Sequence, residues 1–590
     1  MIEQKKRNQI PEEFKWRRDH LFSQVSHWWE SFDQVNQEAD NFFKYRGTLH
    51  DAPMLKECFS TRDSMCQRAE KLYVYANMYL HEDTENPEAQ SLADKADSLS
   101  IKLNSAMSFI DPEILGLSKD QIDAFLALDD VYKHYMDNML RVKEHILSPE
   151  LEELLAQAGE IGMAAENIFS MLNNADMRFG IVKDESGNDV TITHGRFLSL
   201  MESSNADVRR NTFKTFYESY FKQKNTLAAT YNASVRKDVF FTKSRKYSSS
   251  LAWGLHGANI PATVYTNLIQ TVNEYLPAMH QYIRLRGKML GVAELHMYDL
   301  YTPLVPEART AVSYDEAKET VLAALSVMGD DYINTVKKAF AEGWFDVYEN
   351  KGKRSGAYAW GAYGVHPYVL LNYDNKINDM FTLAHEIGHA MHSHYTWATQ
   401  PYVYGDYTIF AAEVSSTVNE ALLMEYLLKN TADTSRKRYL INYFLDQFRG
   451  TVFRQTMFAE FEMKTHEMAE SGQPLTVESL CQLYRELNLR YYGQDIVMDE
   501  EIDIEWARIP HFYSPYYVYQ YATGFSAAIA LSRKILADSA AVGQYIEFLK
   551  SGSSDYSIPL LKKAGVDMSM PEPIQNALEL FQELLNQFNL

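Results

Sequence analysis

The chain has 590 residues, 46% of them hydrophobic, and a formal net charge of −22. This is the composition of a globular protein with ample material for a core, and it disfavours a nucleic-acid-binding surface, which needs clustered Lys and Arg. Three cysteines without a Cys-x-x-Cys pattern form neither a disulfide framework nor a cysteine-based zinc site.

The N-terminus and the hydropathy pattern bear on location. Residues 1–14 contain basic side chains but no apolar run after them, so the pattern is not that of a secretory signal. No stretch of 18 or more apolar residues occurs in the chain, so we expect neither a membrane span nor a membrane partner. A cytoplasmic location is therefore expected.

The first third of the chain is predicted to be helical. Apolar residues recur at spacings of three and four in residues 22–43, 64–79 and 151–173. Two β-rich runs, residues 179–182 and 190–193, flank a Gly/Asn/Asp cluster and predict a β-hairpin.

Helical patterns resume in residues 195–243 and 262–290, and a second non-helical island covers residues 345–373. We expect one or two strands there. Its glycine-rich run, residues 351–361, lacks the spacing of a phosphate loop and indicates a hairpin or loop before the next helix. A functional alternative is that this run, or the strand near residues 366–373, pairs with an extended peptide.

Residues 380–395 form a predicted helix that contains the pattern His-Glu-Ile-Gly-His. His385 and His389 lie four apart, hence on one helix face, where both imidazoles can reach one Zn²⁺ at about 2.0–2.1 Å. Glu386 lies about 100° around the helix from His385, where its carboxylate contacts a water on the metal without ligating. This pattern indicates a zinc metalloprotease.

A catalytic zinc takes three protein ligands and keeps one position open. Glu413, among small and apolar residues of a helix predicted over 410–428, is a candidate third ligand. The other acids that could serve are Glu420 and Asp406. The histidines that follow on the metal helix are interpreted as bystanders or supports, because a third ligand there would need different spacing; they are His392 and His394.

Residues 381–392 resemble the active-site helix of the thimet oligopeptidase-like zinc metallopeptidases, and more closely that of their bacterial oligoendopeptidase F branch. Residues 11–16, 345–348, 412–416 and 561–567 extend the resemblance over essentially the whole chain. It implies one zinc ion per chain and Glu386 as the general base. The implied zinc ligands are His385, His389 and Glu413.

The family also uses a histidine and tyrosines of a late segment, here residues 511–521, to bind substrate and stabilise the oxyanion. His511 and Tyr516 have the family's spacing and are implied as catalytic donors. Beyond Tyr516 the pattern departs from the thimet-like branch, so Tyr517, Tyr519 and Tyr521 are all candidates for binding substrate and the sequence does not choose among them. The alternative is that these tyrosines line a helix interface.

The resemblance implies a mostly α fold, a large multi-helix body of two lobes around a deep substrate channel, with a small β element beside the active-site helix. We expect an N-terminal helical region at 1–110, a helical region ending in the β-hairpin at 111–195, and a catalytic region at 196–590. Such a channel admits short peptides and excludes folded proteins.

The sequence therefore predicts a zinc-dependent endopeptidase of short oligopeptides, with a metal-activated water and Glu386 as base, and with no nucleic-acid partner. One rival hypothesis is a metallocarboxypeptidase. A second is a peptide-binding protein without turnover, which has no need of Glu386. A third, a structural zinc protein, requires a fourth protein ligand that the sequence does not obviously offer.

Overall fold

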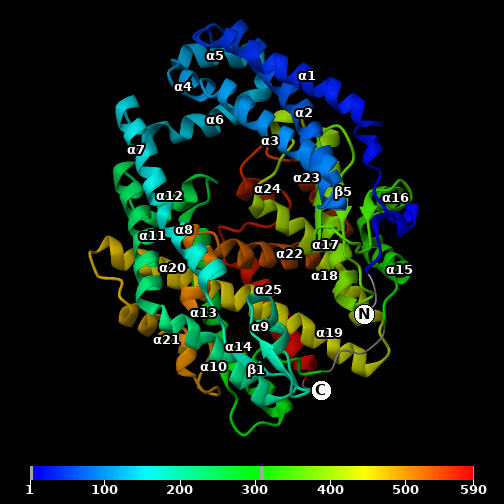
Figure 1. Ribbon diagram of the computed structural model, residues 1–590, viewed down its shortest axis with the longest axis vertical. Helices are drawn as coiled ribbons and strands as arrows, with labels where there is room; N and C mark the ends of the chain where they lie inside the picture. The colour runs from blue at the N-terminus through cyan, green and yellow to red at the C-terminus, as the bar shows by residue number, and fades with distance from the viewer. Residues whose placement is uncertain (1–3, 306–310, 589–590) are drawn as a thin grey trace. The chain divides into compact units, whose positions relative to one another are not determined.

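The computed structural model describes residues 4–305 and 311–588, so the first three residues of the N-terminal segment 1–14 lie outside the described residues. Helices dominate and the strands are short (Figure 1), so the expected mostly α fold is confirmed. Over the described residues, every helix is too short or too polar to cross a membrane.

The chain divides into two compact units, each assembled from three separate stretches of sequence. The first unit comprises Met1–Glu144, Thr310–Tyr426 and Leu531–Val566. The second unit comprises His145–Arg309, Leu427–Ala530 and Asp567–Leu590. The expected regions 1–110, 111–195 and 196–590 divide the sequence differently and stay a prediction, as does the deep channel between lobes.

The first unit contains the N-terminal helices and the helix of the His-Glu-Ile-Gly-His pattern. Its helices are α1 (Val25–Asn41), α2 (Ala52–Glu82), α3 (Pro87–Met107), α4 (Ile110–Leu115), α5 (Lys119–Leu128), α6 (Lys133–Arg141), α15 (Tyr314–Ala324), α16 (Asp330–Ala341), α17 (Ile377–Thr399), α23 (Ser539–Leu549) and α24 (Ser557–Lys563). The division between the units falls inside α18 (Ile409–Asn430) and α22 (Tyr519–Ala537).

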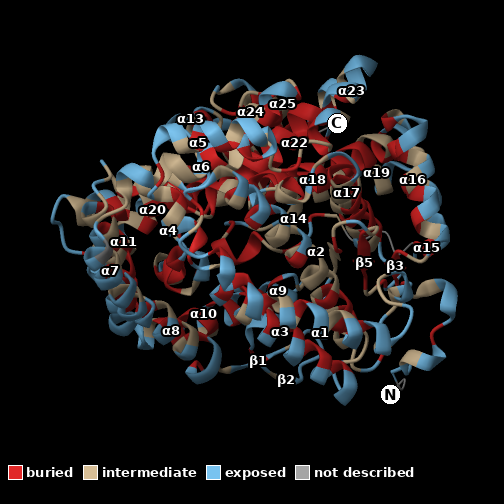
Figure 2. Ribbon diagram, turned by 90° about the horizontal axis from the view of Figure 1, so that it is seen from above, coloured by how far each residue is buried: buried red, intermediate tan, exposed pale blue. Residues whose placement is uncertain are grey.

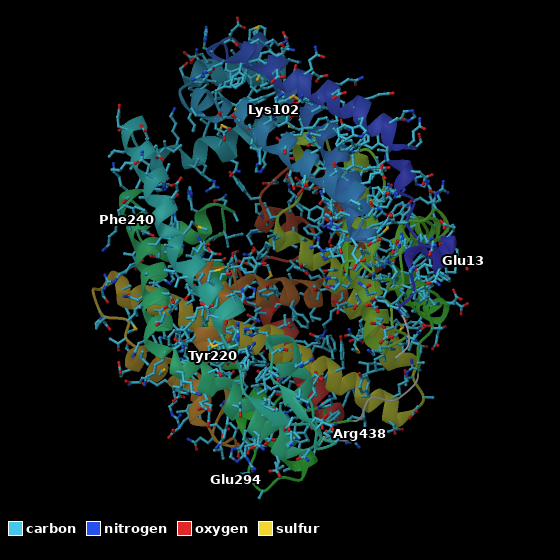
Figure 3. The ribbon with its side chains drawn as sticks, viewed as in Figure 1. Glu13, Lys102, Tyr220, Phe240, Glu294 and Arg438 are labelled. Atoms are coloured by element: carbon cyan, nitrogen blue, oxygen red, sulfur yellow. The ribbon has the colours of Figure 1, made fainter. Side chains whose placement is uncertain are left out.

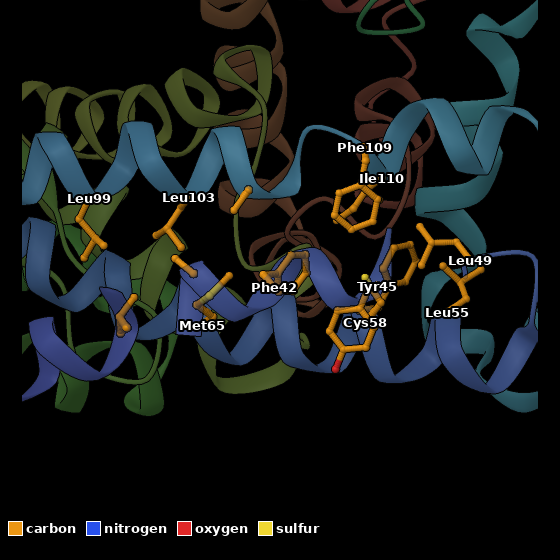
Figure 4. Close-up of a cluster of buried hydrophobic side chains, with 14 of the residues drawn as sticks. Phe42, Tyr45, Leu49, Leu55, Cys58, Met65, Leu99, Leu103, Phe109 and Ile110 are labelled. Carbon is orange, nitrogen blue, oxygen red and sulfur yellow. The ribbon is translucent and has the colours of Figure 1, made fainter. Parts of the chain in front are cut away.

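Helices α1 to α3 pack around one hydrophobic core (Figure 4). Leu99 and Leu103 of α3 are four residues apart and point from one helix face into this core, as the apolar spacing predicts. The indole N–H of buried Trp28 on α1 donates to the carbonyl of Leu72 on α2 at 2.9 Å. Each such buried apolar side chain contributes about 1.5–3 kcal/mol, which holds the three helices together.

A small sheet lies in the same unit and has three strands where one or two were expected. They are β3 (Phe345–Asp346), β4 (Tyr358–Trp360) and β5 (Tyr368–Leu370), in the order β3-β5-β4. β5 pairs in parallel with β3 and antiparallel with β4. Strand β3 has only two residues, too few to show an alternating pattern in the sequence.

This arrangement corrects one expectation. The strand near residues 366–373 was a candidate for pairing with a peptide, but β5 is the central strand and both of its edges are already paired. Backbone hydrogen-bonding groups of β5 are therefore taken, and only an edge strand such as β4 has a free side for another chain.

The sheet is sandwiched within the first unit. Tyr368 and Leu370 of β5 pack with Trp16 and with Val74 of α2 in a second buried cluster. On the other side, β4 packs against α17. The expected small β element beside the active-site helix is thus confirmed.

A buried carboxylate ties the N-terminal segment to this sheet. Asp346 of β3 is fully buried and forms ion pairs with Arg7 and with Lys353, whose Nζ lies 2.7 Å from Asp346 Oδ1. Burial acts to raise the pKa of Asp346, but Lys353 and Arg7 outweigh it and hold this pKa below its usual range. Lys353 Nζ also donates to the carbonyl of Leu371 at 2.6 Å, so the glycine-rich run is fixed to the sheet.

The second unit is almost entirely helical. Its helices are α7 (Pro149–Gly162), α8 (Ala164–Ser170), α9 (His194–Met201), α10 (Ala206–Lys222), α11 (Lys224–Ser244), α12 (Ser250–His256), α13 (Ala262–Glu274), α14 (Leu276–Leu290), α19 (Thr434–Gln447), α20 (Arg454–Glu470), α21 (Val477–Tyr492) and α25 (Glu572–Phe588). The stretch predicted over 262–290 is two helices, because Pro277 at the start of α14 cannot continue α13. Figure 3 shows the side chains, including Phe240 on α11 and Tyr220 on α10.

The predicted β-hairpin of this unit is confirmed. β1 (Ile181–Lys183) pairs antiparallel with β2 (Asp189–Thr191). The Asp184 carboxylate closes the turn by accepting the backbone N–H groups of Ser186 at 2.9 Å and Asn188 at 2.8 Å. Gly187 has a φ of +80°, a left-handed conformation that glycine adopts without strain.

Candidate metal centre

Helix α17 carries the His-Glu-Ile-Gly-His pattern through the interior of the first unit, and Figure 2 shows it among the mostly buried helices. It begins at Ile377, earlier than the pattern predicted, because the Asp379 carboxylate caps the first turn. Asp379 Oδ2 accepts the backbone N–H of Lys376 at 2.9 Å and that of Asp374 at 2.8 Å. The apolar residues of α17 bury its flanks, which leaves one face for the two histidines.

The structure brings His385, His389 and Glu413 together. One ligand atom from each lies within 4.8 Å of the others. The Nε2 atoms of His385 and His389 are 3.2 Å apart, and Glu413 Oε2 lies 3.7 Å from the first and 4.0 Å from the second. Ligands of a tetrahedral zinc at its usual bond lengths are about 3.3 Å apart. Two nitrogens and one carboxylate oxygen at these separations fit a catalytic zinc.

Glycine at position 388 permits this arrangement. A Cβ atom on Gly388 would lie 2.5 Å from both the carbonyl oxygen of Ser415 and the Cα of Ser416 on α18. Ordinary contacts of carbon are about 3.5 Å or longer, so no larger residue fits here without moving α18. The close crossing of α17 and α18 sets the depth at which Glu413 meets the histidines.

Glu420 interacts with His385 on the side of the imidazole ring opposite Glu413. Its Oε1 lies 2.6 Å from His385 Nδ1, the ring nitrogen that does not face Glu413. A carboxylate in this place fixes the imidazole's orientation and leaves Nε2 available to bind a metal ion. Of the three acids that the sequence left open as third ligand, only Glu413 belongs to the described group of ligand atoms; Glu420 and Asp406 do not.

Glu386 is buried beside the two histidines, with 5% of its surface exposed. Its Oε2 has no hydrogen-bond partner in the described part of the chain. Burial raises the pKa of Glu386 to about 7, against the opposing charge of His385, and nearby Glu413 adds to the rise. The backbone N–H of Ala359 on β4 hydrogen-bonds to this carboxyl and lowers its pKa, so the edge strand lies next to Glu386.

The two remaining histidines of α17 lie outside the ligand group, as expected. His392 is buried and stacks on Tyr407, with ring centroids 3.7 Å apart. The Tyr407 hydroxyl contacts Ser393 Oγ at 2.8 Å and donates to the carbonyl of His389 at 3.4 Å. His394 packs against Trp344. Tyr407 therefore braces the turn of α17 that carries His389.

The late segment forms part of the second unit, and its residues divide into two groups. His511 is exposed and its ring stacks on Tyr517, with centroids 5.6 Å apart; the Tyr521 hydroxyl lies 3.3 Å from His511 Nε2. Tyr516 and Tyr519, by contrast, are each 3% exposed. The five side chains that the sequence grouped thus have different environments, and their assigned roles stay predictions.

Two supporting groups were missed as such by the sequence analysis. Glu420 lies seven residues beyond Glu413, two helical turns on the same face, and this spacing was the available signal. The role of β4 could not be read from the sequence, because its three residues show no alternation and their place depends on the pairing with β5.

Two family models match the sequence of this helical chain. Residues 199–580 match peptidase family M3 and residues 113–179 match a model described as Oligopeptidase F. The chain belongs to peptidase family M3, a family of metallopeptidases, and the resemblance to oligoendopeptidase F is confirmed.

Individual relatives match over nearly the full length. Oligopeptidase PepF of Bacillus subtilis (strain 168) is 47% identical, with 100% of this chain and 89% of that protein covered. Group B oligopeptidase PepB of Streptococcus agalactiae is 42% identical, with 98% and 97% covered. The crystal structure of oligoendopeptidase-F from Enterococcus faecium superposes with a TM-score of 0.74 at 38% identity, with 96% and 98% covered.

Proposed function

We propose that this chain is a zinc-dependent endopeptidase that hydrolyses internal bonds of short oligopeptides, with one zinc ion per chain. The observation that carries the proposal is the grouping of His385, His389 and Glu413 around one point, with Glu386 buried beside them. Membership of peptidase family M3 and the oligopeptidase names of its relatives support it. A cytoplasmic location and the lack of a nucleic-acid partner remain expectations from the sequence.

The four side chains have different roles in the proposed reaction. His385, His389 and Glu413 hold the zinc ion and leave one position open. When bound, the ion polarises the scissile carbonyl and makes a water at its open position more acidic. Glu386 accepts the proton of the attacking water through its unpartnered Oε2 and returns it to the leaving amine.

The late segment supplies donors in this proposal. We retain His511 as a donor to the oxyanion on the strength of the family resemblance. Among the tyrosines, exposure favours Tyr517 and Tyr521, because a hydroxyl must be accessible to meet a substrate. Tyr516 and Tyr519 are less suited as donors, because both are buried.

The edge strand β4 is the proposed partner of the peptide backbone. Its other side is paired with β5, and the Ala359 amide faces Glu386 rather than β5. An extended peptide added along β4 would place its backbone next to the general base. A peptide complex without main-chain contacts to residues 358–360 would reject this part.

The test is hydrolysis of a pool of short internally quenched peptides by the wild type and by Glu386→Gln, with metal content measured for both. We expect internal cleavage by the wild type, loss of cleavage on chelation, and retention of zinc with loss of most turnover in Glu386→Gln. Full activity of metal-loaded Glu386→Gln would refute the role of Glu386. Removal of C-terminal residues alone, abolished by blocking the C-terminus, would identify a carboxypeptidase instead. No cleavage by zinc-loaded wild type would indicate a peptide-binding protein.

A further inference from the structure

Tyr516 has an unusual backbone conformation within the second unit. It lies between the 3₁₀-helix η13 (Pro510–Tyr513) and α22, and its φ of +56° is left-handed. For a residue with a side chain this conformation costs about 1–2 kcal/mol. The surroundings of Tyr516 must therefore impose it.

A buried glutamate holds the backbone of this turn. Glu462 of α20 is completely buried, and its Oε1 accepts the backbone N–H of Tyr516 at 2.7 Å. Its Oε2 has no hydrogen-bond partner within the described residues. A buried carboxyl is unfavourable unless it is well bonded, and nearby His466 and the N–H of Tyr516 both compensate for the burial of Glu462.

The aromatic ring of Tyr516 is held by close packing against helices α12, α13 and α20. A Cβ atom on Gly254 of α12 would lie 2.4 Å from Cδ2 of the Tyr516 ring, so the ring occupies the space that glycine leaves. The ring also packs against Tyr265 of α13 and His466 of α20, with centroids 5.6 and 5.0 Å away. His466 is held in turn by Asp238, whose Oδ2 lies 3.2 Å from His466 Nε2.

The turn determines which side chains point outward. With Tyr516 anchored inside, its half-buried neighbour Tyr517 stacks on His511, and Tyr521 in the first turn of α22 completes this group. We propose that Glu462 and Gly254 are positioning residues for the peptidase reaction: by anchoring Tyr516 they fix the geometry of the group His511, Tyr517 and Tyr521. The proposal rests on the proposed function of that group.

The experiment compares variants of Glu462, which binds the backbone of Tyr516, with a variant of Gly254, which contacts its ring. Glu462→Met removes the acceptor, Gly254→Ala fills the ring slot, and Glu462→Gln keeps a carbonyl oxygen of the same reach. Misplacing a reacting group by about 1 Å lowers rates up to about 100-fold. We therefore expect Glu462→Met and Gly254→Ala to lower kcat about 10- to 100-fold, with KM within about threefold of wild type and full zinc content. Glu462→Gln should restore near-normal kcat.

A matched control and a double variant sharpen the test. A Cβ on Gly257, just after α12, meets nothing within 4 Å, so Gly257→Ala should behave as wild type. Since both changes act through Tyr516, the effects on kcat of Glu462→Met and Gly254→Ala should combine less than additively.

Several results would overturn the proposal. Wild-type kcat in folded, zinc-loaded Glu462→Met and Gly254→Ala would do so, as would a Glu462→Gln enzyme as slow as Glu462→Met. If Glu462→Met does not fold, Gly254→Ala alone carries the test. Parallel assays of His511→Ala distinguish failure of the positioning role from failure of the proposed function of His511. A slow His511→Ala with fast anchor variants refutes only the positioning role, whereas a fast His511→Ala removes the function on which that role rests.

Discussion

Replacing Gly388 by alanine should disrupt the metal centre without touching any ligand. The added Cβ would lie 2.5 Å from backbone atoms of Ser415 and Ser416, and backbone cannot rotate away as a side chain can. To restore an ordinary contact of about 3.5 Å, α18 must retreat by about 1 Å. Glu413 is two residues from Ser415 on this helix and moves with it. Zinc–ligand bonds stay within about 0.2 Å of their usual lengths, so a shift of about 1 Å away from the histidines disables the proposed third ligand.

We expect zinc affinity of Gly388→Ala to fall at least about 10- to 100-fold, and overpacking to destabilise the unit by about 1–3 kcal/mol. Affinity is measured by competition with a chromophoric chelator, and stability by thermal unfolding of the metal-free protein. Gly543→Ala on α23 is the matched control, because a Cβ there meets nothing within 4 Å. Wild-type zinc affinity in folded Gly388→Ala would refute the argument that this crossing sets the position of Glu413.

Three further changes test the site and its scaffold. Glu413→Ala should abolish stoichiometric zinc binding while the helices remain folded; retained metal would mean that another acid is the ligand. Glu420→Ala should keep the ligand set but lower zinc affinity about 10- to 100-fold, since His385 loses the group that orients it, and equilibrium dialysis would show this. Glu505→Gln should destabilise the second unit by about 3–5 kcal/mol, because the half-buried Arg454 and Arg508 lose the buried carboxylate that is their counter-charge. Burial acts to raise the pKa of Glu505, but Arg454 and Arg508 outweigh it and lower this pKa from 4.5 to about 2. The stabilisation by Glu505 is therefore complete above pH 4.5 and lost as pH falls towards 2, so the melting-temperature gap to Glu505→Gln should shrink over that range; a gap independent of pH would contradict it.

The metal helix was predictable because its chemistry is local. His385, Glu386 and His389 lie within about one helical turn, so their relation follows from helix geometry alone. The proposed third ligand was not predictable in this way. Glu413 and Glu420 lie on one face of α18, and which of them faces Nε2 of His385 depends on where α18 crosses α17 at Gly388.

The environments of the tyrosines in residues 511–521 were also not predictable from the sequence. Their spacing in the sequence allows all of them to line one surface. Whether Tyr516 points in or out depends on a left-handed turn, on Glu462 and on the space beside Gly254, which come from distant helices. A single sequence does not reveal such contacts, because nothing near Tyr516 in the chain encodes them.

The discontinuous construction of the first unit has a consequence for biosynthesis. The metal helix α17 rests on α23, where Thr396 Oγ1 donates to the carbonyl of Leu549 at 2.9 Å and Tyr545 packs in the interior. All three proposed ligands are synthesised more than a hundred residues before that support. Contacts between such distant segments form late. A nascent chain ending at residue 530 would therefore carry every proposed ligand and still lack part of the framework that shapes the site.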